Sequence, residues 1–161
     1  MTETAAQSEE MVQLAIHKGE DAELCVGGLR FVACRREVGE IDGGISLYVS
    51  SDVPGDDRQL LRFDFFRANP HYHAPAENQA ETKIELAATD DSAAWGIDAL
   101  TTRAPELFRQ GGFDELAAKL DTAALGSAGE GLRALFARLA EPTEVSYFDV
   151  PKSVVDSLAA K

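Results

Sequence analysis

The sequence has few of the features that mark several common classes of protein. Cysteine occurs only at Cys25 and Cys34, without CxxC spacing, which argues against a disulfide framework or a zinc cluster. No apolar run approaches about 18 residues, so an ordinary membrane-spanning helix is not predicted. The first ten residues are acidic and lack a basic segment followed by an apolar one, so no secretory signal is visible. We therefore expect a cytoplasmic protein with no membrane partner.

Positive charge is also scarce. The chain of 161 residues has 28 acidic and 15 basic residues, a formal net charge of -13. This charge repels phosphate backbones and argues against nucleic acid as a partner. It is compatible with a protein partner or a homodimer, although an acidic composition also favours solubility alone. The arginines that concentrate in the expected sheet are Arg30, Arg35, Arg36, Arg58, Arg62 and Arg67.

Composition and length favour one ordered domain. Apolar residues make up 45% of the chain and charged residues 27%. A chain of this length buries roughly two-thirds of its unfolded surface, and we find no internal repeat or low-complexity linker. We expect a single domain over residues 1–161. Within it we expect a solvated tail over 1–9, an antiparallel sheet over 10–88, a helical layer over 90–141, and a C-terminal extended arm and helix over 144–161.

Alternating apolar and polar residues predict strands in the first half of the chain. The segments with this pattern are 11–17, 24–38, 45–50, 58–67 and 82–87. Phe63 and Phe65 share the face expected to point into the core, and Arg62 and Asp64 alternate with them on the other face. The Gly27-Gly28 pair suggests a bulge or a bend within a strand. The short connections favour an antiparallel meander of about four to five strands.

Beyond residue 90 the apolar residues recur at helical spacing. This predicts a helix over 92–110 that Pro105 interrupts, and a short helix over 113–120. Ser127 and Glu130 have the spacing of a capping box for a third helix, and Pro151 suits the first position of a last one. Strands followed by helices indicate an α+β fold, with three to four C-terminal helices over one face of the sheet.

The C-terminal segment is apolar enough to need a partner surface. Its candidate docking residues are Tyr147, Phe148, Val154, Val155 and Leu158. Two interpretations stay open for this segment. It either packs on its own domain or forms a docking arm for another subunit or protein.

The segment from Arg62 to Glu85 contains two of the three histidines of the chain. His71 and His73 are separated by one residue, so on an extended backbone both imidazoles leave the same side. Glu77 can supply a carboxylate. Two imidazoles and a carboxylate suit zinc, iron(II) or manganese, so the sequence predicts a candidate metal site at these three residues.

Two resemblances bear on this segment. The letters HYHAPAE at residues 71–77 resemble the first metal motif of the cupin family, in which HxH is followed by a glutamate, and this implies a bound metal ion. The likeness covers that segment alone. A broader one, to uncharacterised bacterial α+β proteins of similar size, rests on an RFDxF strand at residues 62–66 followed by a PHYH loop at 70–73. It implies a shared fold and no known activity.

The same residues can also act without a metal. Arg62, Asp64 and Tyr72 are candidates to bind a ligand or to form a polar network with the histidines. A sheet-based ribonuclease toxin would use such residues as acid and base, but the net charge opposes RNA binding. We therefore expect a non-catalytic binding or regulatory module for a protein partner or a small ligand. The alternative is a metal-dependent enzyme or metal-binding protein.

Overall fold

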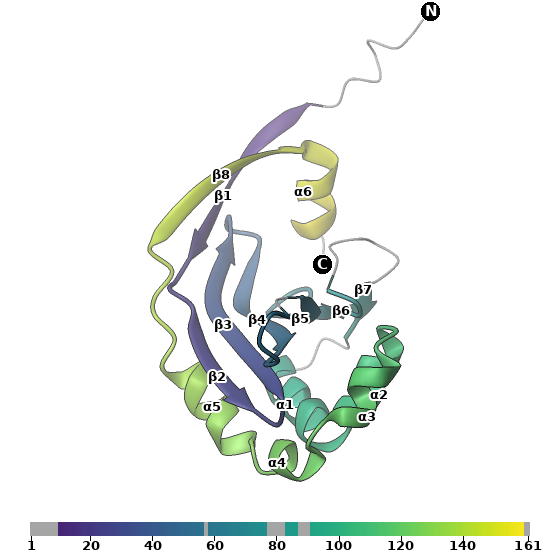
Figure 1. The fold of residues 1–161 in the computed structure, drawn as a ribbon. Coiled ribbons are helices and arrows are strands. Elements are labelled where there is room, and N and C mark those ends of the chain that lie inside the picture. The colour runs from purple at the N-terminus through teal and green to yellow at the C-terminus, as the bar shows by residue number, and fades with distance from the viewer. Residues whose placement is uncertain (1–9, 57, 77–82, 87–90, 160–161) are drawn as a thin grey trace, which may run out of the picture.

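The protein is an α+β protein with an antiparallel sheet, as expected (Figure 1). The computed structural model describes residues 10–56, 58–76, 83–86 and 91–159. These residues form a sheet of eight strands and six helices. The strands are β1 (Met11–Lys18), β2 (Ala22–Val26), β3 (Leu29–Val38), β4 (Asp42–Ser51), β5 (Gln59–Phe66), β6 (His71–His73), β7 (Lys83–Glu85) and β8 (Glu144–Pro151). The helices are α1 (Ser92–Thr102), α2 (Ala104–Gln110), α3 (Asp114–Lys119), α4 (Thr122–Gly126), α5 (Gly129–Ala137) and α6 (Lys152–Ala159).

The strands from β3 to β7 form the predicted meander, and the ends of the described chain are added at the far edge. The order across the sheet is β7-β6-β5-β4-β3-β1-β8. β2 and β1 pair with successive parts of the same edge of β3, at its N-terminal and C-terminal halves. β1 pairs with β8 over its whole length but with β3 only at Ile16–Lys18. The rest of the β1–β8 pair therefore extends beyond β3 as a two-stranded arm.

The prediction of four to five strands is wrong for three local reasons. Gly27 and Gly28 have φ of +66° and +89°, and they form the turn between β2 and β3 where a bulge was expected. Residues 71–73 form strand β6, so the expected PHYH loop contains a strand. The C-terminal segment forms a full strand of eight residues, β8, because β1 provides a partner along its whole length.

One face of the sheet and the helices α1 to α5 enclose a single apolar core. Its fully buried residues include Phe31, Leu47 and Phe63 from the strands and Leu100, Phe108 and Leu132 from the helices. Gly96 lets α1 approach the sheet closely, because a side chain there would collide with the Phe65 ring. Helix α6 follows β8 and lies apart from the other helices, inside the curve of the sheet (Figure 1).

The helical half follows the predicted order with more elements than expected. The chain breaks between α1 and α2 just before Pro105, as predicted, but the short helix α4 was missed. The expected capping box is wrong, because the N-cap of α5 is Ala128 and has no side-chain cap. Pro151 ends β8, so α6 begins one residue later than expected. None of the helices among the described residues has the length and apolar character to cross a membrane.

Candidate functional site

The sheet face opposite α1 to α5 carries a group of polar side chains at one end. Asp64 on β5 lies directly opposite Ser46 on β4 and His71 on β6. Arg62 lies opposite Tyr48 and His73 in the same way. Residues that pair directly across strands share a face. The register therefore brings two rows together, which we call the polar cluster: Ser46, Tyr48, Arg62, Asp64, His71 and His73.

Four members of this cluster are buried although they belong to the polar face: Ser46, Asp64, His71 and His73. Asp64 is only 1% exposed, and His71 and His73 are buried as well. A buried carboxylate is stable only when its oxygens have hydrogen-bond partners or counter-charges. The contacts of Asp64 are therefore central to the site.

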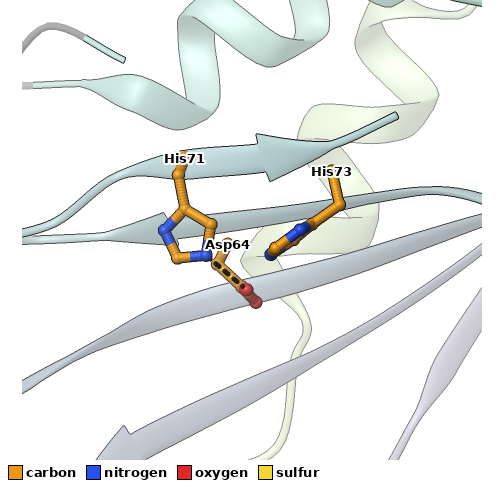
Figure 2. Close-up of side chains that lie close together, drawn as sticks. All are labelled: Asp64, His71 and His73. Carbon is orange, nitrogen blue, oxygen red and sulfur yellow. Dashed lines mark ion pairs between the residues drawn. The ribbon is translucent and has the colours of Figure 1, made fainter. Parts of the chain in front are cut away.

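Asp64 accepts contacts from three side chains, and Figure 2 shows the one with His71. The Ser46 hydroxyl donates to Oδ1 over 2.8 Å. Arg62 Nη2 and His71 Nε2 each lie 3.1 Å from Oδ2. Burial alone would raise the pKa of Asp64, but the hydrogen bonds from His71 and Ser46 and the charge of Arg62 outweigh it and hold that pKa at about 2. Asp64 is therefore a carboxylate at neutral pH.

The His71 ring faces an acceptor at both nitrogens. Nδ1 lies 2.8 Å from the Asn69 carbonyl oxygen, which can only accept, so Nδ1 carries a hydrogen. Nε2 faces the ionised Asp64 carboxylate, which also only accepts. A positive charge is needed between Nε2 and Asp64. Either a second proton on His71 or a metal ion supplies it.

His73 completes a set of possible metal ligands. Its ring centroid is 5.2 Å from that of His71, with the two rings nearly perpendicular. Burial lowers the pKa of His73, and the charges of His71 and Arg62 lower it further, which favours the neutral imidazole that binds metals. One ligand atom each from Asp64, His71 and His73 can lie within 4.8 Å of the others. This arrangement suits a divalent ion better than any other group of described residues does.

The polar cluster continues along the sheet through Tyr48. The Arg62 guanidinium lies over the Tyr48 ring, 5.6 Å from its centroid. The Tyr48 hydroxyl accepts a hydrogen bond of 3.2 Å from Arg36 on β3. The Nε atoms of Arg36 and Arg62 are both buried without a hydrogen-bond partner among the described residues. The cluster therefore has donor capacity that its own side chains leave unused.

The structure brings together some of the predicted site residues and separates others. His71, His73, Arg62 and Asp64 lie in the polar cluster. Tyr72 lies on the opposite face, where its ring stacks on Phe63 and its hydroxyl donates to Gln110 over 2.7 Å. Glu77 lies outside the described residues, and the carboxylate that lies beside the two histidines is that of Asp64. The sequence feature that could have placed Asp64 beside the histidines is a hairpin in which Asp64, seven residues before His71, lies directly opposite it.

The predicted docking residues lie on the β1–β8 arm and on α6. Tyr147 is 61% exposed, Phe148 50% and Val154 46%. Val155 is half-buried, and the side chain of Leu158 is outside the description. Among the described strands, β8 pairs only with β1, so its outer edge is open.

Fold and site together define a small α+β protein with a buried aspartate–histidine cluster on its sheet. Residues 23–134 match the family described as a domain of unknown function (DUF7700), and the chain belongs to that family. This agrees with the expected membership of an uncharacterised family. No curated protein and no solved structure matches the chain. The matched residues run from β2 into α5 and include the whole polar cluster, whereas β1, β8 and α6 lie outside them.

Proposed function

We propose that the protein is a binding module whose polar cluster holds a divalent transition-metal ion between Asp64, His71 and His73. The observation that carries this proposal is the orientation of the His71 ring. The Asn69 carbonyl accepts from Nδ1, so Nε2 is the nitrogen that faces the Asp64 carboxylate 3.1 Å away. Carbonyl groups orient metal-binding histidines in this way.

The ligand set narrows the choice of metal. Two imidazoles and one carboxylate bind zinc, iron(II) or manganese and leave positions open for water or a small ligand. Those open positions are what a binding module would use, and a metal-dependent enzyme would use the same ones. Arg62 competes with a metal ion for Asp64, because its guanidinium contacts the same carboxylate oxygen as His71 does. Removing that charge should favour the cation.

Elemental analysis of protein purified without a histidine tag tests the proposal. We expect close to one ion per chain after incubation with zinc, iron(II) or manganese followed by desalting. The His71→Ala/His73→Ala double variant and Asp64→Asn should retain almost none. Arg62→Gln should bind the ion more tightly than the wild type, because the competing charge is gone.

His17→Ala is the matched control, because His17 is the third histidine and lies on β1, away from the cluster. It should bind metal as the wild type does. Circular dichroism establishes that each variant is folded. Equal metal in the wild type and in the folded double variant, or none in the wild type after incubation, would contradict the proposal.

A second candidate function is docking of a protein partner or of a second copy on the β1–β8 arm. It is favoured by the open edge of β8 and by the exposed side chains of Tyr147 and Phe148. Exposed strand edges with apolar side chains readily pair with another chain. Size-exclusion chromatography with light scattering, combined with a pull-down, should then show a dimer or a retained partner. A lone monomer that retains nothing would count against this candidate.

A further inference from the structure

Strand β8 lies at the edge of the sheet and lacks the usual features that prevent pairing with another strand. It is eight residues long, pairs with β1 without a bulge, and is the last strand on that side of the sheet (Figure 1). Natural proteins commonly block such an edge with a lysine, a proline, an inward-pointing charge or a bulge. β8 contains neither lysine nor arginine, and its one proline, Pro151, is its last residue. Its outer edge therefore suits a further strand.

The backbone groups of β8 alternate between its two edges. The Lys152 N–H donates to the Glu10 carbonyl oxygen over 2.9 Å, so the even-numbered residues of β8 direct their N–H and C=O groups at β1. Val145, Tyr147 and Asp149 therefore direct theirs at the outer edge. No strand of the described chain pairs with that edge. These donors and acceptors have the alternating spacing that an antiparallel strand requires.

The charges at the two ends of β8 select one register for pairing with a second copy. Glu144 is the first residue of the strand, and Lys152 directly follows its last. If the two β8 strands are antiparallel about a two-fold axis at Phe148, Glu144 of each copy lies opposite Lys152 of the other. Their positions differ by an even number, so both side chains leave the same face. An axis at Asp149 would instead bring two carboxylates together, and an axis at Tyr147 would form neither contact.

The same register brings apolar side chains together at the axis. Phe148 then lies opposite the Phe148 of the second copy, in a pair without ladder hydrogen bonds, where the Cα atoms are about 4.5 Å apart. Its ring is 50% exposed in the single chain. Leu14 lies directly opposite Phe148 on β1, on the same face, and is half-buried. Pairing therefore removes apolar surface from water at the centre of the contact.

We infer that the protein forms a two-fold symmetric dimer in which the β8 strands of two copies pair in antiparallel direction about Phe148. This inference rests on the second candidate function, docking on the β1–β8 arm, and names a second copy of the chain as the partner. The net charge of -13 opposes association of two copies. The attraction is therefore local, and it depends on the ladder of β8, the two Phe148 rings and the Glu144–Lys152 contacts at both ends.

Disulfide cross-linking tests the register. All variants carry Cys25→Ser, which removes the exposed native thiol and leaves only the buried Cys34. Phe148→Cys should then form a covalent dimer under mild oxidation, because the two thiols lie opposite each other within disulfide range. Tyr147→Cys is the matched control. It is more exposed, at 61%, but it lies opposite Asp149 of the second copy and should cross-link much less.

Charge reversal tests the contacts at the ends of β8. Lys152→Glu should weaken dimerisation by about tenfold or more in sedimentation velocity, because it makes two attractive contacts repulsive. The double variant Glu144→Lys/Lys152→Glu exchanges the charges and should recover most of the affinity. Lys152 also lies 4.0 Å from Glu10 of its own chain, but both are largely exposed and that contact contributes little. Lys119→Glu, on α3, changes the net charge equally and should dimerise as the wild type does.

Three results would overturn the inference. The first is a wild type that stays monomeric as its concentration is raised. If that monomer retains another protein in the pull-down, docking on the arm stands and the second copy is wrong as the partner. The second is cross-linking of Tyr147→Cys as readily as of Phe148→Cys, which would leave a dimer but contradict the register. The third is a folded double charge variant, checked by circular dichroism, that dimerises no better than Lys152→Glu.

Discussion

Replacing Asp64 with alanine should lower the free energy of unfolding by about 3–5 kcal/mol. The substitution removes the acceptor shared by Ser46, Arg62 and His71. It leaves the Arg62 guanidinium, which is only 18% exposed, without its counter-charge. Breaking a buried pair by removing one partner is costly because the remaining charge stays out of water. Urea denaturation of the metal-free protein at neutral pH measures the change.

Two further variants separate the causes of this loss. Asp149→Ala removes an exposed carboxylate on β8 and should change the free energy of unfolding by less than about 0.5 kcal/mol. Asp64→Asn keeps the shape and loses the charge, so its effect should be intermediate. A loss below about 1 kcal/mol for Asp64→Ala would mean that the polar cluster contributes no more than a surface ion pair does.

The pH dependence of stability provides an independent check on the same residue. The pKa of Asp64 falls from 3.8 to about 2 on folding, so its carboxylate stabilises the folded state above pH 3.8. That contribution, about 2 kcal/mol, should disappear as the pH falls from 3.8 towards 2. The pKa of His73 is also lowered on folding, from 6.5. Below pH 6.5 the unfolded state therefore binds a proton at His73 more readily than the folded state does, so the free energy of unfolding falls there as well. Asp64→Ala should no longer show the loss of stability between pH 3.8 and 2, but it should keep the loss that His73 causes below pH 6.5.

The site could be predicted in part because its pattern is local. The spacing of His71 and His73 and the alternation of Phe63 with Asp64 both follow from an extended backbone. The pairing of Asp64 with His71 depends on the register of a hairpin. Pro70 suggested that the strand region ended there, but it directly precedes β6, where its missing N–H costs nothing and its carbonyl accepts from Leu86. A strand of three residues is too short for an alternating pattern to reveal.

For the fold, too, features within one segment could be predicted and pairings between segments far apart in the sequence could not. The strand segments over β1, β3, β4 and β5 were found because apolar residues alternate within each of them. The pairing of β1 with β8 joins the two ends of the described chain, and neither segment specifies its partner by itself. The total number of strands was therefore underestimated, while the α+β class was correct.

Replacing Phe63 with alanine should also lower the free energy of unfolding by about 3–5 kcal/mol, through the loss of packing alone. Phe63 is fully buried, and its ring lies 5.4 Å from Phe65 and 5.2 Å from Tyr72, measured between centroids. Its neighbours in β5 are Arg62 and Asp64, so a cavity there lies directly beneath the polar cluster. The metal occupancy that we propose for this cluster should fall together with stability, and urea denaturation and elemental analysis of the same sample measure both.

Phe148→Ala is the matched control, because it removes the same side chain from a position that is 50% exposed on β8. In a monomer its loss should cost less than about 1 kcal/mol, since the ring is only partly removed from water on folding. A cost as large as that of Phe63→Ala, rising with protein concentration, would mean that the ring is buried against a second copy. That result would favour docking on the β1–β8 arm. A cost as large as that of Phe63→Ala but independent of protein concentration would mean that Phe148 packs on its own chain more closely than its exposed fraction indicates.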